Sequence, residues 1–379
     1  MIVLCPRWSD RGSASSTLHG ETTMRIVITG ATGNVGSALV RRLVAAGGHE
    51  LVGLARRPPD PGRAPFDEVE WFTTDLTTDG SLPVLREAFR GASAVVHLAW
   101  GFQPSHDEAY LEALGVGGTR RVLRAVEDEQ VPHLVHMSSV GAYSRKRDDT
   151  PVDESWPTRG VPSSPYSRHK AAAERLLDEH EARGTGTVVA RMRPGIVGQS
   201  SAGSALLRYG VPALVPSRAL RLLPVLPLDR RLNVPLVHSA DVADAVVRVL
   251  DQGAGGAFNL AADPPVTAGI LARALGARHV HVPAAALRVA MSGAWHARVQ
   301  PVDPGWLDLG YAVPLLDTSR ARSVLGWSPT SDGVAVLAEV LDGMRRADSD
   351  HTPALRPRSV AEQVRRLVRS GPVSMRREP

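Results

Sequence analysis

A tyrosine and a lysine stand four residues apart at Tyr166 and Lys170, where the spacing of apolar residues predicts a helix over residues 166–180. On a helix, this spacing places the phenol and the ammonium on one face, within reach of a shared ligand. A cation about 4 Å away, at an effective dielectric of about 20, contributes about 4 kcal/mol, roughly what lowers a tyrosine pKa from about 10 to about 7. We therefore expect Lys170 to activate Tyr166 as an acid/base group for a substrate alcohol or carbonyl. Ser139, at the end of a predicted strand, would hydrogen-bond the same oxygen.

Three glycines spaced three apart, Gly30, Gly33 and Gly36, follow the β-branched run that begins at Arg25. This pattern predicts a strand, a tight turn and the start of a helix, where backbone N–H groups can approach a diphosphate. Glycine-rich turns before helices also occur in proteins that bind no nucleotide. The apolar residues 50–55 predict a second strand after the helix, which completes a βαβ unit and favours dinucleotide binding.

Two arginines, Arg56 and Arg57, follow the second strand, where NAD-specific folds place a carboxylate for the ribose hydroxyls. A guanidinium there suits a 2′-phosphate, so we expect NADP to be favoured over NAD. The alternative is that both arginines are solvated residues opening a proline-rich loop. Asp75, after the third predicted strand, could face the adenine amine.

Strands and helices alternate through the first half of the chain, which predicts an α/β fold with a doubly wound, Rossmann-like parallel sheet. Further strands are predicted at 69–72, 94–99, 133–137 and 188–193, with a helix over 108–126. After Pro194-Gly195 the alternation stops, and it resumes with a strand at 236–238 and a helix over 241–250. We therefore expect a dinucleotide-binding domain of residues 24–193 plus 236–263, and a discontinuous substrate lobe of residues 194–235 plus 264–345.

Composition argues for a globular protein without nucleic-acid partners and without stable membrane association. The chain has 379 residues, of which 43% are hydrophobic, and a formal charge of +5, of which residues 346–379 carry +4. The sequence pI of about 9.8 therefore does not indicate a nucleic-acid-binding core. No run of about 18 apolar residues occurs, and Cys5 is the only cysteine, so we expect a cytoplasmic protein without a disulfide.

Both ends of the chain differ in composition from the middle. Residues 1–23 are expected to form a disordered extension, and Met24 is an alternative start of translation. Residues 346–379 are expected to form a basic tail, with an amphipathic helix over 359–369 after a proline-rich break. That helix could dock on the protein itself or bind weakly to an anionic membrane.

The chain resembles the extended short-chain dehydrogenase/reductase superfamily, known as the NAD-dependent epimerase/dehydratase family, over roughly residues 24–345. The matching segments are 29–36, Asp75-Leu76, His97-Leu98-Ala99, Ser138-Ser139, Tyr166 with Lys170, Arg193-Pro194-Gly195, Val237-His238 with Asp241, and 325–329. The resemblance implies that Ser139, Tyr166 and Lys170 are catalytic. It also implies cofactor contacts at Gly30, Thr32, Gly33, Asn34, Val35, Gly36, Arg56, Asp75, Leu76, Leu98, Ala99, Tyr166, Lys170 and Pro194.

Two positions depart from the family pattern. Gly115 stands where the family usually has asparagine, and Val234 stands where sugar-nucleotide members often have arginine. The first departure puts in doubt a proton relay through that helix, and the second counts against a sugar nucleotide as substrate. The resemblance further implies a homodimer that packs through the helices over 108–126 and 166–180.

These patterns support three hypotheses for function. The leading one is an NAD(P)-dependent oxidoreductase that acts on a small secondary alcohol or ketone. The second is a sugar-nucleotide epimerase or dehydratase with tightly held NAD, and the third is a non-catalytic NADP sensor, which Tyr166 and Lys170 disfavour. We expect no metal site, because His97, His136 and His238 lie on or beside apolar strands and resemble packed residues.

Overall fold

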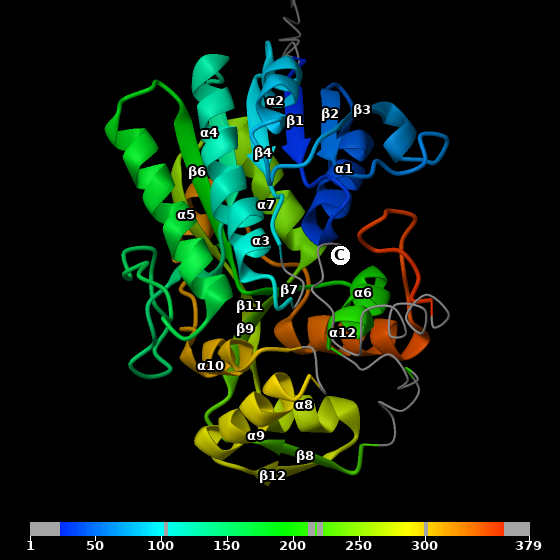
Figure 1. Ribbon diagram of the computed structural model, residues 1–379, viewed down its shortest axis with the longest axis vertical. Helices are drawn as coiled ribbons and strands as arrows, with labels where there is room; N and C mark the ends of the chain where they lie inside the picture. The colour runs from blue at the N-terminus through cyan, green and yellow to red at the C-terminus, as the bar shows by residue number, and fades with distance from the viewer. Residues whose placement is uncertain (1–22, 102–104, 211–216, 218–222, 299–301, 360–379) are drawn as a thin grey trace, which may run out of the picture.

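A seven-stranded parallel sheet forms the centre of the molecule, as the computed structural model shows for residues 23–101, 105–210, 217, 223–298 and 302–359 (Figure 1). Its strands are β1 (Arg25–Thr29), β2 (Glu50–Ala55), β3 (Val69–Thr73), β4 (Ala94–His97), β5 (His133–Met137), β6 (Val188–Pro194) and β10 (Gly256–Leu260). They are arranged in the order β10-β6-β5-β4-β1-β2-β3. Strand order reverses between β1 and β4, which is the doubly wound arrangement that the sequence predicted.

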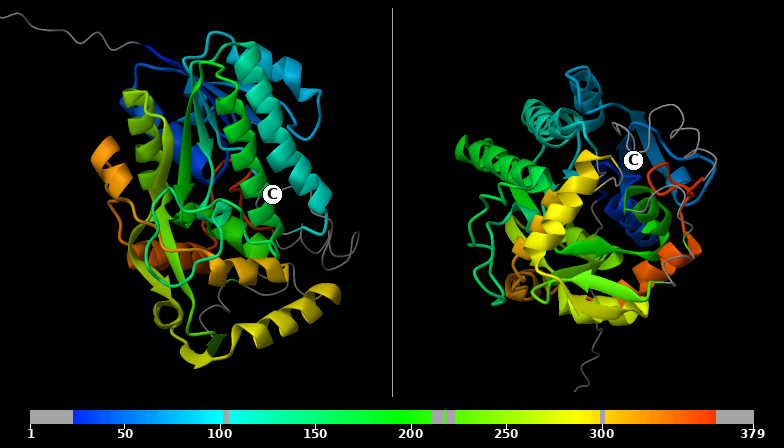
Figure 2. Two further views of the ribbon diagram at one scale, coloured as in Figure 1. Left: turned by 90° about the vertical axis from the view of Figure 1, so that its left-hand side faces the viewer. Right: turned by 60° about the horizontal axis from the view of Figure 1, so that its bottom comes forward.

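Helices cover both faces of this sheet (Figure 2). One face carries α1 (Asn34–Ala46), α7 (Ser239–Gln252) and α11 (Ser319–Leu325), and the other carries α2 (Ser81–Phe89), α4 (Gly118–Asp128) and α5 (Pro165–Ala182). Successive strand residues point to opposite faces. In β1, Ile26 and Ile28 pack in the first cluster and Val27 packs in the second, and all three are fully buried. This two-sided burial explains the nearly continuous apolar strands.

Two sequence predictions need correction. The predicted helix over 108–126 is interrupted: α3 (Glu108–Glu112) is followed by a π-helical turn, Ala113–Gly117, before α4 begins. The predicted strand at 236–238 is part of β9 (Asn233–His238), which lies outside the central sheet. The seventh place is taken by β10, which sequence reasoning missed because its short stretch GAFNL begins with glycine and lacks a run of β-branched residues.

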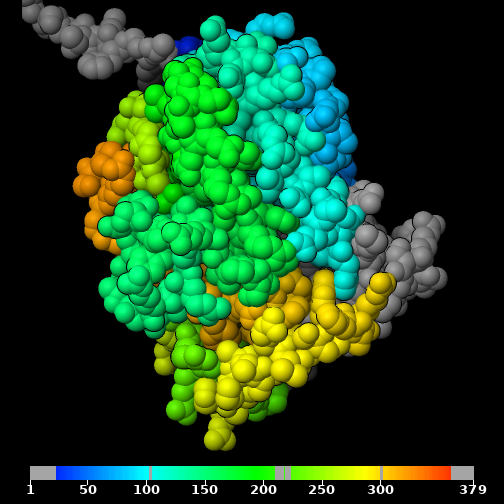
Figure 3. All heavy atoms as spheres, turned by 60° about the vertical axis from the view of Figure 1, so that its left-hand side comes forward, coloured from blue at the N-terminus to red at the C-terminus, as the bar shows by residue number. Residues whose placement is uncertain are grey.

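A smaller lobe lies beyond the carboxyl ends of the strands, at the bottom of Figure 1. It contains a sheet of β7 (Ile196–Gly198), β9 and β11 (Ala262–Thr267), and a two-stranded sheet of β8 (Val225–Leu228) and β12 (Arg278–His281). Its helices are α6 (Gly203–Gly210), α8 (Ala268–Leu275), α9 (Ala284–His296), α10 (Pro304–Ala312) and α12 (Gly333–Arg346). In Figure 3 the yellow α9 lies below the cyan residues that follow β4, and Trp295 of α9 stacks on His106 with centroids 3.4 Å apart.

The two ends of the chain fall mostly outside the described residues. This applies to the predicted extension before Thr23 and to the predicted amphipathic helix beyond Ser359. The proline-rich break before that helix packs on the protein: Leu355 is buried beside Ala205 of α6, and Arg41 of α1 forms an ion pair of 2.8 Å with Asp350. Within the described part of the chain, no helix has the length and apolar character needed to cross a membrane.

Candidate functional site

The glycine-rich loop packs closely against the end of β4. Gly30 has a φ of +72°, and a Cβ there would stand 2.7 Å from the backbone nitrogen of Ala99. A Cβ on Gly36 would stand 2.2 Å from the carbonyl oxygen of Gly30, so the first turn of α1 touches the loop directly. Helix α1 begins after Gly33 without a side-chain cap. These features fit a dinucleotide, because bare backbone N–H groups at a helix start suit its diphosphate.

The other predicted cofactor residues lie around the same edge of the sheet. Leu98 donates its N–H to the carbonyl of Thr29 at 3.0 Å. Asn34 donates its side-chain amide to the carbonyl of Val197 at 3.1 Å, which joins α1 to β7. Pro194 ends β6 and is paired with Leu260. The remaining residues of this set are Thr32, Val35, Leu76 and Ala99, which follow β1, β3 and β4 in the chain.

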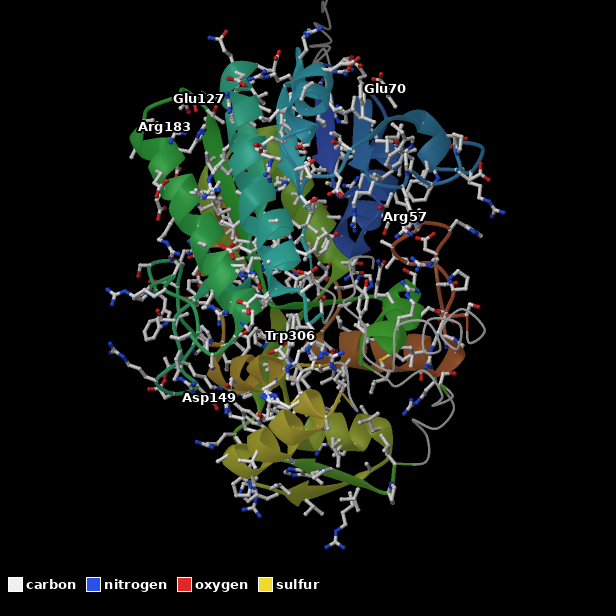
Figure 4. The ribbon with its side chains drawn as sticks, viewed as in Figure 1. Arg57, Glu70, Glu127, Asp149, Arg183 and Trp306 are labelled. Carbon is white, nitrogen blue, oxygen red and sulfur yellow. The ribbon has the colours of Figure 1, made fainter. Side chains whose placement is uncertain are left out.

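Arg56 is held in place at the carboxyl end of β2. Its guanidinium donates a hydrogen bond to the hydroxyl of Tyr110 on α3 and lies 5.9 Å from the centroid of that ring. The neighbouring Arg57, labelled in Figure 4, is exposed. Asp75 is also exposed, and its carboxylate accepts the N–H of Thr77 at 3.0 Å, so this residue forms a local turn. The Arg56 side chain is therefore anchored against helix α3.

Ser139 and Tyr166 meet where β5 ends and α5 begins. Ser164 caps α5, and its N-terminal proline, Pro165, precedes Tyr166. The Ser139 side chain hydrogen-bonds the Tyr166 phenol. Gly141 permits this approach, because a Cβ there would lie 2.8 Å from the tyrosine ring. Burial raises the pKa of Tyr166 to about 12, although Ser139 opposes that rise.

This result overturns the expectation that Lys170 lowers the pKa of Tyr166 towards 7. The Lys170 ammonium is 6.0 Å from the centroid of the Tyr166 ring, and it donates to the carbonyl of Met137 at 2.8 Å. Lys170 is itself buried, and burial lowers its pKa to about 7, against the opposing effect of Glu174. Desolvation thus shifts both groups towards their neutral forms.

Two tryptophans flank the phenol. The Trp306 ring, from α10, lies 4.8 Å from the Tyr166 ring, and the Trp100 ring lies 6.4 Å from it in an edge-on arrangement. Figure 4 shows Trp306 between the sheet and the lower lobe. The sequence contains no local pattern that links either tryptophan to Tyr166. These rings cover part of the Tyr166 ring, which is half-buried.

A buried ion network lies next to the candidate catalytic residues. Glu174 is fully buried one helical turn after Lys170, and it accepts hydrogen bonds from Ser138 at 2.5 Å and from Arg193 at 2.8 and 2.9 Å. Arg191 contributes a further ion pair of 3.0 Å. Burial alone would raise the pKa of Glu174, but Arg193 and its other partners lower it below the usual range. Glu174 therefore links α5 to the ends of β5 and β6.

The three histidines for which the sequence predicted a packed environment, His97, His136 and His238, lie in different surroundings. His97 is buried between two hydroxyls, at 2.7 Å from Thr29 and 3.2 Å from Thr119. Burial and the nearby Lys170 charge lower its pKa to about 3, so it is neutral. His136 is also buried, with its ring centroid 5.3 Å from that of His97. His238 caps α7 and pairs with Glu339 at 3.3 Å.

The amino-acid sequence matches a known protein family and several of its members. The model of the NAD dependent epimerase/dehydratase family matches residues 26–261. The chain is 29% identical to UDP-glucose 4-epimerase of Mycolicibacterium smegmatis over 83% of its own length and 98% of that protein. It is 30% identical to dTDP-6-deoxy-L-talose 4-dehydrogenase (NAD(P)(+)) of Kitasatospora kifunensis over 80% of its length and 91% of that protein.

Two further matches differ in how much of the matched protein the alignment covers. An uncharacterized protein of Mycobacterium tuberculosis is 27% identical over 81% of this chain, yet the match spans only 28% of that protein. Among solved structures, UDP-glucose 4-epimerase of Thermus thermophilus in complex with NAD aligns with a TM-score of 0.63 and 23% identity. That alignment covers 86% of this chain and all of the other, and it shows a shared fold.

We predict that Glu174→Gln destabilises the protein by about 3–5 kcal/mol, because it leaves Arg193 and Arg191 buried without their carboxylate. The measurement is urea unfolding at neutral pH. Since the folded pKa of Glu174 is depressed, its contribution is present above the unfolded pKa and is lost as the pH falls, so the difference from wild type should shrink in acid.

The matched control is Asp178→Asn, which removes another partner of Arg191 at 2.6 Å, but whose side chain is 61% exposed. Its cost should stay within about 1 kcal/mol. Equal costs for the two variants would contradict a special role for the buried carboxylate.

Proposed function

The chain belongs to the NAD-dependent epimerase/dehydratase family, and from that premise we propose that it transfers a hydride between a nicotinamide cofactor and the carbon of a secondary alcohol or ketone. The observation that carries this proposal is the hydrogen bond between Ser139 and the Tyr166 phenol beside buried Lys170. In this proposal the sheet domain binds the dinucleotide and the lobe takes the substrate.

The proton chemistry follows from the environment of Tyr166. With a pKa of about 12 the phenol is protonated at neutral pH, so it can donate its proton to a carbonyl oxygen that accepts a hydride. Ser139 would hydrogen-bond that same oxygen. Lys170 would hold the nicotinamide ribose, and Gly30, Gly33 and Gly36 would hold the diphosphate. The bound cofactor supplies or accepts the hydride.

A second candidate function is epimerisation or dehydration of a sugar nucleotide with tightly held NAD. It is favoured by the relative named UDP-glucose 4-epimerase, which matches most of this chain and of its own length. The relative named for a dTDP-sugar is a dehydrogenase, so it supports a sugar nucleotide as substrate but hydride transfer as the reaction. Val234 disfavours it, since this side chain is buried in the apolar cluster that includes Leu236 and Leu309 and cannot pair with a diphosphate. Identifying any copurified cofactor and assaying nucleoside-diphosphate sugars separates the two candidates.

We predict that Tyr166→Phe lowers turnover by about 10²–10⁴-fold while cofactor binding stays close to wild type, because the ring and its aromatic contacts remain. The measurement is the change in nicotinamide absorbance across a panel of ketones, alcohols and nucleotide sugars, with the cofactor Kd determined by calorimetry. Full turnover by the variant would exclude Tyr166 as the acid/base. If wild type binds cofactor and turns over nothing in the panel, the non-catalytic sensor gains support.

For the cofactor we propose a preference for NADP, which rests on Arg56 at the end of β2. Its attachment to Tyr110 fixes a guanidinium after β2, the position at which dinucleotide folds recognise the ribose hydroxyls or a 2′-phosphate, and a guanidinium can bind phosphate through two N–H groups. The solved structure compared above contains NAD.

Arg56→Ala should therefore weaken NADP binding by about 10-fold or more and leave NAD binding nearly unchanged. Arg57→Ala is the matched control, since Arg57 is the exposed neighbour with the same charge. Titration of each variant with both cofactors gives the comparison. A wild-type preference for NAD, or equal losses of the two cofactors, would contradict the proposal.

We also propose a homodimer that packs through α4 and α5. In one molecule these helices lie side by side, and Glu127 and Arg183 at their ends form an ion pair of 3.1 Å, seen at the upper left of Figure 4. Their outward faces carry the exposed Arg120, Arg124 and Arg175. In a two-fold dimer these like charges would face one another and repel, so screening by salt should favour the dimer. A cytoplasmic location is proposed from composition alone.

Light scattering at micromolar concentration should therefore give the dimer mass in about 1 M salt and an average mass no larger than that in about 0.1 M salt. A monomer under both conditions would contradict the dimer. A dimer that dissociates as the salt concentration rises would place the interface on a different surface, where opposite charges meet.

A further inference from the structure

Trp100 lies on the ammonium of Lys170. The residue follows β4 at the carboxyl edge of the sheet, and its ring centroid is 3.5 Å from the Lys170 Nζ. The same ammonium donates to the carbonyl of Met137 at 2.8 Å. A cation at this distance from an indole face is attracted by the ring quadrupole, and the ring occupies space that water would otherwise fill. The indole and the Met137 carbonyl thus hold the ammonium between them.

The indole fits a recess formed by Gly115 in the π-helical turn. A Cβ on Gly115 would stand 2.9 Å from Cζ2 and 3.0 Å from Cη2 of Trp100, so no larger residue fits without moving the ring. The recess is held by hydrogen bonds: the Thr119 hydroxyl donates to the Gly115 carbonyl at 2.7 Å and lies 3.2 Å from His97. π-Helical turns occur frequently at functional sites.

We propose that Trp100, seated against Gly115, is a positioning residue that covers the Lys170 ammonium, keeps water from it and holds it against the Met137 carbonyl. The importance of this contact for catalysis rests on the function proposed above, whereas the contact itself can be tested without any reaction. Neither residue has a local sequence motif that would reveal the pairing.

Exposure to water has the largest influence on the pKa of Lys170, as the groups around it show. On α5 it is near Glu174, which favours the charged ammonium, and near Tyr166, which is protonated at neutral pH. His97 on β4 and His136 on β5 are both neutral, because burial lowers their pKa values. The two arginines of β6, Arg191 and Arg193, are paired with Glu174. Burial is the main cause of the low pKa of Lys170, so removing its cover should raise that pKa.

The chain contains only two lysines, which permits a direct measurement. In a Lys146→Arg background, protein labelled with carbon-13 at lysine Cε gives one lysine signal, and its pH titration by NMR reports Lys170 alone. For Trp100→Ala we expect the midpoint to rise by at least about 1 pH unit, because water reaches the ammonium. Trp100→Phe should keep the midpoint closer to wild type, since a ring still covers the cation. An unchanged midpoint in Trp100→Ala would overturn the proposal.

A double-mutant cycle tests the recess. Gly115→Ala should displace the indole and raise the Lys170 midpoint in the Trp100 protein, but it should add nothing in Trp100→Ala. The matched control is Gly117→Ala in the same turn, whose Cβ would meet chiefly the end of the Arg121 side chain, at 2.9 Å, and which should leave the titration unchanged. Equal effects of the two alanines would overturn the proposal.

If Trp100→Ala fails to fold, the Lys170 midpoints of Gly115→Ala and Gly117→Ala are sufficient to test the proposal. These titrations use the cofactor-free protein. Their outcome is therefore independent of whether Tyr166→Phe abolishes turnover.

Discussion

The buried carboxylate of Glu174 sets the geometry on which the candidate catalytic residues depend. An unpaired carboxylate at this depth would cost several kcal/mol, so the folded state must bring Arg191 and Arg193 of β6 against it. The same carboxylate binds Ser138, the residue before Ser139. A slip of α5 by one residue would rotate the carboxylate away from these partners and leave it unpaired. Because Tyr166 and Lys170 lie two turns and one turn earlier on α5, this one buried charge fixes the face they present.

Desolvation dominates the chemistry of the candidate site. It raises the pKa of Tyr166 to about 12, lowers that of Lys170 to about 7 and lowers that of His97 to about 3. All three shifts favour the neutral form, as expected where aromatic rings replace water. A simple Coulomb estimate from the Tyr166–Lys170 spacing failed because it included the attraction between the two groups and omitted the cost of burying each of them. The arrangement suits proton donation by the phenol better than proton abstraction.

The sequence predicts those parts of the structure that depend on neighbours in the chain. The first six strands, the glycine-rich turn and the pair on α5 all have local periodicities or spacings, and the structure contains these elements close to the predicted bounds. Features that depend on distant residues were missed: the position of β9 outside the central sheet, the partners of Glu174 and the aromatic contacts of Tyr166. Gly115 is instructive, because the sequence identified it as a departure from the family pattern. Only the fold shows that the missing side chain makes room for Trp100, which lies on a different element.

The placement of the lobe also bears on how such proteins diversify. Segments of the lobe that are far apart in the sequence approach each other closely: a Cβ on Gly195 would lie 2.5 Å from the carbonyl oxygen of Pro235, and one on Gly333 would lie 2.3 Å from that of Pro264. Insertions or exchanges between such fixed points leave the strand register and the glycine-rich loop untouched. A lineage built on this sheet can therefore acquire a new lobe by insertion while it inherits the same buried charge. Selection for a new substrate need not disturb the folding of the sheet domain.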